Sequence, residues 1–136
     1  MTRYVLDTNV VLAWLFPDRT SEAETFFGQL SGVDDLAAAP LLLSEATSVI
    51  RREVFDRRLR DEQARDRLQV LMDLQLRIVD SKSYYVRAFE LARQFQHRKA
   101  YDMQHLAVAE SEEAALVTFD RGLRHAAREI GVPLFF

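Results

Sequence analysis

The sequence predicts an α/β fold, a three-layer α/β/α sandwich around a central, mostly parallel sheet of four to five strands. Short apolar segments alternate along the chain with longer segments in which apolar residues recur at helical spacing. The short segments are apolar throughout, which is typical of strands buried on both faces of a parallel sheet. With only four Gly and three Pro, the sequence contains no linker. We therefore expect residues 1–136 to form a single domain.

The first elements follow from strand formers and turn residues. Arg3 to Leu6 is rich in strand formers and is followed by turn residues, so we expect a strand there. A helix is expected from Val10 to Phe16, because the residue before Pro17 is pushed out of the helical region. Ser21 and Glu24 have the spacing of a capping box, which predicts a helix from Ser21 to about Leu30.

The middle of the chain predicts one strand and a pair of helices. Leu36 to Ala39 has the composition of a buried strand that ends at Pro40. A long helix toward Asp56 is expected from the helical spacing of its apolar residues, which are Leu42, Ala46, Val49, Ile50 and Val54. Asp61 is expected to cap the next helix, whose inward residues would be Ala64, Leu68, Leu71 and Met72.

The second half repeats the alternation of strands and helices. We expect strands at Arg77–Val79 and Ala115–Thr118, and helices at Ser83–Gln96, Asp102–Glu112 and Arg121–Glu129. Gly131 has the position of a residue that ends a helix in the left-handed conformation. The last segment, Pro133 to Phe136, is predicted to be an edge strand, where proline is tolerated.

Composition excludes several kinds of chemistry. There is no Cys, which excludes disulfides, thiolate catalysis and sulfur-ligated metals, so a bound metal must use oxygen or imidazole ligands. The apolar run from Val10 to Phe16 has seven residues, far short of the roughly 18 that a membrane span needs. We expect neither a signal peptide nor contact with a membrane, and a cytoplasmic location. The 18 Lys and Arg against 21 Asp and Glu give a net charge of −3, which by itself argues against nucleic acid.

Four acids are expected at one end of the sheet, where ligands bind in open parallel sheets. Asp7 ends the first strand, and Asp120 follows the strand at 115–118 by two residues. Glu45 lies early in the helix after Pro40, and Asp102 opens a helix at the edge of its apolar face. Carboxylates so close would repel one another, and a hard divalent cation removes that conflict. The set is typical of metal-dependent phosphodiester cleavage.

Each acid also has a purely structural interpretation. Asp7, Asp102 and Asp120 could cap the helices that follow them, and Glu45 could be an ordinary first-turn residue. Taken singly, these interpretations are the better ones. Capping does not explain why acids from four segments fall at one end of the sheet, so together they favour a metal site.

Four motifs resemble the PIN-domain nucleases, in the same order and over essentially the whole chain. They are Tyr4-Val5-Leu6-Asp7-Thr8-Asn9-Val10-Val11-Leu12, Pro40 to Glu45 with Ser44 before the acid, Tyr101-Asp102 through Glu110, and Leu116-Val117-Thr118-Phe119-Asp120. The chain is most similar to the VapC-type toxins of toxin-antitoxin pairs. It departs from the usual pattern at Met103 and at Glu113-Ala114-Ala115, neither of which is a proposed ligand.

The resemblance implies a function and a set of roles. Asp7, Glu45, Asp102 and Asp120 would be the catalytic metal-binding carboxylates, and Thr8, Asn9 and Thr118 would orient them or the ions. One or two Mg²⁺ ions, or Mn²⁺, would support endoribonuclease activity on RNA. The partners implied are a VapB-type antitoxin that blocks the site and a second copy of the chain, as a homodimer within a larger toxin-antitoxin complex.

Other polar and aromatic residues have less specific interpretations. Arg98, Lys99, Arg121 and Arg124 are either a solvated surface or contacts to RNA phosphates. The histidines, His105 among them, are interpreted as packing residues, and the Arg-rich stretch from 51 to 67 as a surface helix pair laced by ion pairs. The aromatic residues of the first two helices could be core or an antitoxin groove, and they are Trp14, Phe16, Phe26 and Phe27.

Two alternative functions remain. A non-catalytic RNA-binding module of the same fold would be expected to have lost one or more acids, but all four are present. A phosphotransfer or phosphatase domain is disfavoured, because Asn9 stands where such phosphatases need a second Asp and the only lysines are Lys82 and Lys99.

Overall fold

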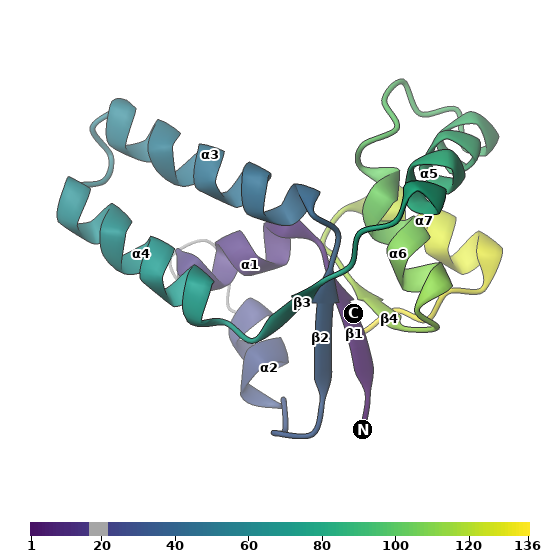
Figure 1. Cartoon of the computed structure of the whole chain (residues 1–136), viewed down its shortest axis with the longest axis horizontal. Coiled ribbons are helices and arrows are strands. Elements are labelled where there is room, and N and C mark those ends of the chain that lie inside the picture. The colour runs from purple at the N-terminus through teal and green to yellow at the C-terminus, as the bar shows by residue number, and fades with distance from the viewer. Residues whose placement is uncertain (17–21) are drawn as a thin grey trace.

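The computed structural model describes residues 1–16 and 22–136 (Figure 1). Within these residues four strands alternate with helices. The elements in order are β1 (Arg3–Leu6), α1 (Thr8–Leu15), α2 (Glu22–Gly28), β2 (Asp35–Ala38), α3 (Leu41–Phe55), α4 (Asp61–Asp73), β3 (Leu76–Ile78), α5 (Lys82–Gln94), α6 (Met103–Ser111), β4 (Ala115–Val117) and α7 (Arg121–Ile130).

The four strands form one parallel sheet in the order β3-β2-β1-β4. Successive residues of the central strand face opposite sides, since Tyr4 and Leu6 join one apolar core and Val5 joins the other. The first core holds apolar residues of α1 to α4, and the second holds those of α5 to α7. The predicted three-layer α/β/α architecture is therefore confirmed, with helices on both faces of the sheet (Figure 1).

The two predicted outer strands need correction. Pro133 to Phe136 is not a strand, because Leu134 makes only an isolated bridge to Leu116. The segment still lies beside β4, since the Leu116 amide donates to the Pro133 carbonyl at 2.8 Å and the Phe135 amide donates to the Leu116 carbonyl at 3.2 Å. Phe135 also packs edge-on against Tyr4 and Phe26. The strand β3 is also not buried throughout, since Arg77 and Ile78 are exposed at the edge of the sheet.

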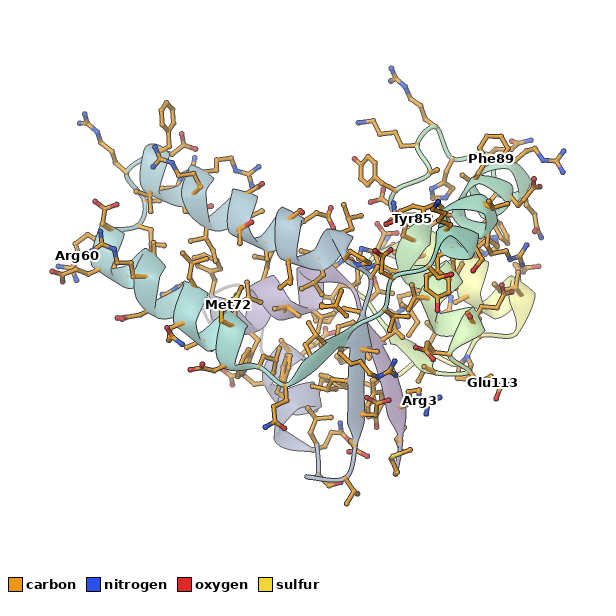
Figure 2. The ribbon with its side chains drawn as sticks, in the orientation of Figure 1. Arg3, Arg60, Met72, Tyr85, Phe89 and Glu113 are labelled. Atoms are coloured by element: carbon orange, nitrogen blue, oxygen red, sulfur yellow. The ribbon has the colours of Figure 1, made fainter. Side chains whose placement is uncertain are left out.

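The predicted helices are present, with shifted ends. Helix α1 begins at Thr8, two residues earlier than expected, and α4 is preceded by Arg60 as its N-cap, so Asp61 is the first helical residue and not the cap. Met72 is not an inward residue of α4: it is 55% exposed and lies on the outer face (Figure 2). Gly131 ends α7 with a φ of 79°, as its position predicts. The predicted Pro17 stop and Ser21 cap fall outside the described residues.

Parallel strands bring their carboxyl ends to one edge of the sheet, and the chain leaves that edge through α1, α3 and α7. Figure 1 shows α3 and α4 extending together on one side of this edge and α5 to α7 packed on the other. Among the described residues no helix has the length and apolar character to cross a membrane.

Candidate functional site

Asp7 occupies the N-cap position of α1, yet its carboxylate makes no capping hydrogen bond. It accepts instead a hydrogen bond of 2.6 Å from the Thr118 hydroxyl at the end of β4. The side chain is nearly buried, with 7% of the residue exposed. A buried carboxylate that leaves its own helix uncapped is not explained by capping, so the structural interpretation of Asp7 fails.

Glu45 projects from the second turn of α3 toward α1. Its Oε1 accepts a hydrogen bond of 2.6 Å from the Thr8 hydroxyl. A hydrogen bond from His105, together with that from Thr8, outweighs burial and lowers the pKa of the Glu45 carboxyl. Glu45 is therefore held in its charged form beside Asp7.

His105 is buried, as expected for a packing residue, but its imidazole also contacts two of the predicted site acids. Its Nε2 lies 3.2 Å from Asp7 Oδ1 and 3.5 Å from Glu45 Oε1, although the residue is only 1% exposed. Burial disfavours the charged imidazole, but the hydrogen bond to Glu45 and the neighbouring carboxylates prevail and raise the pKa of His105. Its Nδ1 is buried and has no hydrogen-bond partner among the described residues. His105 thus contacts two acids of the site, Asp7 and Glu45.

Asp102 stands at the N-cap of α6 and, like Asp7, makes no capping hydrogen bond. Burial and the negative charges of Glu45, Asp7 and Asp120 raise the pKa of its carboxyl. Three other acids are thus close enough to Asp102 to oppose its ionisation. The structure brings together the four acids that the sequence singled out.

Asp120 is the acid for which the structural interpretation holds in part. Its Oδ1 accepts a hydrogen bond of 2.8 Å from the Leu123 amide, so it caps α7, and its own amide donates to the Thr118 hydroxyl at 3.0 Å. The carboxylate remains exposed to solvent. A cap of this kind uses one oxygen and leaves the other free for a ligand.

His97 also borders this site, although no sequence pattern predicts it there. A Cβ on Gly122 would stand 3.2 Å from Asp120 Oδ1 and 3.3 Å from His97 Cε1. The imidazole and the carboxylate therefore both border the bare Cα of Gly122. The backbone of His97 is fixed where α5 ends, since its amide donates to the Ala92 carbonyl at 2.8 Å.

The remaining polar residues of the prediction lie around the four acids. Asn9 Oδ1 accepts a hydrogen bond of 3.3 Å from the Phe119 amide, which ties the start of α1 to the loop before α7. Arg98 and Lys99 are exposed in the loop before α6, and Arg121 is exposed at the start of α7. Arg124 is half-buried, and its Nε has no hydrogen-bond partner among the described residues.

The aromatic residues of the first two helices divide between core and surface. Phe26 is fully buried and Phe16 nearly so. Trp14 and Phe27 are partly buried and stack on each other, with ring centroids 4.4 Å apart. The first pair is therefore core, and only the second pair reaches the surface.

The donor set decides which ligands would suit the site. In the part of the chain that the structure describes, no group of three or more His, Cys, Asp or Glu side chains already closes around a point where a metal ion would sit. Burial and the negative charges of the other acids raise the pKa of Asp102, and a bound cation would relieve the repulsion among these acids. Carboxylate oxygens are the ligands that Mg²⁺ and Mn²⁺ prefer, so the residues present fit such an ion.

Comparison with known proteins identifies the family. The family model described as PIN domain matches residues 4–129, nearly the whole chain. The chain belongs to the PIN domain family. No curated protein matches the sequence of this PIN domain.

Solved structures share its fold at low sequence identity. VapBC2 from Rickettsia felis, bound to a DNA fragment from its promoter, is 18% identical with a TM-score of 0.68, over 98% of this chain and 96% of that chain. A toxin-antitoxin complex from Klebsiella pneumoniae is 17% identical with a TM-score of 0.64, over 86% of both chains. VapC20 from Mycobacterium tuberculosis, a sarcin-ricin loop cleaving toxin, is 16% identical with a TM-score of 0.69, over 90% of this chain and 94% of that chain.

Proposed function

We propose that this PIN domain is a cytoplasmic, divalent-metal-dependent endoribonuclease and acts as the toxin of a toxin-antitoxin pair. The observation that carries the enzymatic proposal is the gathering of four acids, in which burial and the charges of the other three raise the pKa of Asp102. Two of these acids, Asp7 and Asp102, leave the helices that follow them uncapped. Their position serves a ligand better than it serves the fold.

The chain's own residues have distinct tasks in this proposal. Asp7, Glu45, Asp102 and Asp120 would hold one or two Mg²⁺ or Mn²⁺ ions. Such ions, when bound, supply Lewis acidity that activates water and neutralises the leaving oxygen of a phosphodiester. Thr118 and Thr8 fix the rotamers of two of the acids through hydrogen bonds of 2.6 Å. Preorganised acids of this kind need no rearrangement as charge develops in the reaction.

RNA phosphates would be held beside the acids by cationic side chains. Arg98, Lys99 and Arg121 are exposed on the two segments that lead into Asp102 and out of Asp120. Arg124 lies one turn further along α7 and is half-buried. Asn9 would act indirectly, through its hydrogen bond to the loop before Asp120.

The enzymatic proposal is tested by cleavage of labelled single-stranded and structured RNA over a titration of Mg²⁺ and Mn²⁺. Wild type should cleave, chelation should abolish cleavage, and Asp102→Asn should lose it while remaining folded. The matched control is Asp66→Asn, which makes the same change at an exposed residue of α4. Undiminished cleavage by Asp102→Asn would contradict the proposal. RNA binding without cleavage by wild type would favour a non-catalytic module, and release of phosphate from a monoester would favour a phosphatase.

The toxin role rests on likeness to the structures of toxins and toxin-antitoxin complexes described above. We propose a VapB-type antitoxin as partner and a homodimer within the larger complex. Expression of the chain should arrest bacterial growth, and co-expression of the protein encoded by an adjacent short gene should restore it. Light scattering of the purified protein measures the assembly state, and a monomer at micromolar concentration would contradict the homodimer.

A further inference from the structure

One face of α3 connects Glu45 to an exposed aromatic side chain. Glu45, Ser48, Arg52 and Phe55 follow one another at intervals of three or four residues, so they lie along one stripe of the helix. At 1.5 Å per residue, Arg52 is about 10 Å and Phe55 about 15 Å along the helix from Glu45. The stripe starts at the proposed catalytic site and runs away from the sheet along the arm formed by α3 and α4 (Figure 1).

Phe55 is the unusual member of this stripe, because 74% of it is exposed although it is a large apolar residue. The Arg51 guanidinium lies over its ring, 5.9 Å from the centroid. The two residues border an open hollow of about 540 Å³ together with Thr47, Ser48 and Arg52. Hollows of this size accept small organic groups.

The charge of this hollow is positive. Arg51 and Arg52 are both exposed, and neither forms an ion pair within the described part of the chain. The nearest acids along the helix, Glu53 and Asp56, are instead approached by Arg58, at 4.0 and 3.8 Å. Two guanidinium groups without a carboxylate partner among the described residues, beside an exposed ring, match the phosphates and bases of a single-stranded nucleic acid.

We propose that the hollow on α3 binds single-stranded RNA next to the cleavage site, with Arg52 and Arg51 on the backbone phosphates and Phe55 stacked on a base. The proposal rests on the ribonuclease function proposed above and adds a binding surface outside the four acids. With this surface, bound RNA would extend from the four acids along α3, on the side away from α7.

Binding is tested by fluorescence anisotropy with a short, labelled single-stranded RNA of mixed sequence, with every variant built on Asp102→Asn so that the RNA stays intact. Phe55→Ala should weaken binding about 5- to 100-fold, the range for one stacked base. The matched control is Phe89→Ala, since Phe89 is 60% exposed on α5, on the other side of the molecule (Figure 2). This control should bind as the parent does.

Two further measurements assign the contacts. A set of RNAs is tested, each lacking the base at a different position. With Phe55 present, removing the base that stacks on it should weaken binding, and with Phe55→Ala removing that same base should have no effect. Arg52→Gln should reduce the slope of log affinity against log salt by about 0.7, the value for one phosphate contact on a single strand. Equal affinities for Phe55→Ala and Phe89→Ala, or an absence of RNA binding by the parent, would overturn the proposal. Cleavage by wild type is measured separately, so the proposed function can stand when the binding surface fails.

Discussion

The hydroxyl of Thr118 joins two acids of the proposed site, and its removal is the sharpest test of the site's geometry. It donates to Asp7 Oδ2 at 2.6 Å and accepts from the Asp120 amide at 3.0 Å. Thr118 is 1% exposed and Asp7 is 7% exposed, so water has little access to either partner. Thr118→Val keeps the shape of the side chain and deletes both hydrogen bonds.

The expected cost is the sum of two lost contacts. A hydrogen bond to a charged acceptor contributes about 1.5–3 kcal/mol, and a neutral one to an amide about 0.5–1.5 kcal/mol. Thr118→Val should therefore lower the free energy of unfolding by about 2–4.5 kcal/mol. For a chain of this length, that corresponds to a decrease in Tm on the order of 10 °C.

The measurement is urea unfolding at neutral pH in the presence of a chelator, with the denaturant slope m compared between variants. An unchanged m with a lower midpoint assigns the effect to the native contacts. Thr118→Ser is the control, since it keeps the hydroxyl and deletes only a methyl group, at a cost of about 1 kcal/mol. A Thr118→Val protein within about 0.5 kcal/mol of wild type would refute the reasoning, because a buried carboxylate cannot lose its donor at so small a cost.

Three further predictions concern charge and space. Burial and neighbouring acids raise the pKa of Asp102, so the native state loses stability as pH rises from the ordinary pKa to the raised one. Asp102→Asn should therefore raise Tm at neutral pH in the presence of a chelator. An unchanged or lower Tm would count against the crowding of acids. The Arg77 guanidinium, 2.8 Å from Asp35, lowers the pKa of that carboxyl, so the ion pair stabilises the fold fully above the ordinary pKa of 3.8 and is lost as pH falls through the lowered pKa. Arg77→Gln should remove about 1 kcal/mol of stability at neutral pH and less in acid. A loss of stability that does not shrink in acid would contradict this. Gly122→Ala places a Cβ 3.2 Å from Asp120 Oδ1, so the carboxylate must shift and RNA cleavage should fall. Stability should not fall with it, because alanine improves helix propensity by up to about 1 kcal/mol. Full activity would show that the carboxylate has room to move.

The layers of the fold could be predicted because the spacing of apolar residues within each strand and helix shows which of its faces is buried. Continuous apolar runs predict central strands, as β1 and β2 confirm. The edges could not be predicted in the same way. Pro133 to Phe136 pairs with β4 only around Leu134, and the ring of Phe135 packs against Tyr4 and Phe26, which lie in distant parts of the chain. Such a contact leaves no periodic signal near residue 135.

The four acids could be predicted because chain order alone places them at the ends of strands or the starts of helices. His105 could not, because its contacts depend on how α6 crosses the sheet. One signal was available, since His105 follows Asp102 by three residues and so shares its side of the helix, just before the apolar run Leu106 to Ala109. His97 gave no such signal. Its place beside Asp120 is set by the end of α5 and by the missing Cβ of Gly122.

The net charge of −3 has a different meaning once the acids are placed. Apart from the four acids of the proposed site, the chain carries 17 acidic and 18 basic residues, so its remaining surface is close to neutral. A neutral surface provides no long-range field to attract RNA, and affinity must come from a few local contacts. The guanidinium groups of Arg51 and Arg52 would provide contacts of that kind, and divalent ions at the acids would add others. The salt dependence of RNA binding should therefore be set by the number of these local contacts, at about 0.7 in the slope of log affinity against log salt for each phosphate contact.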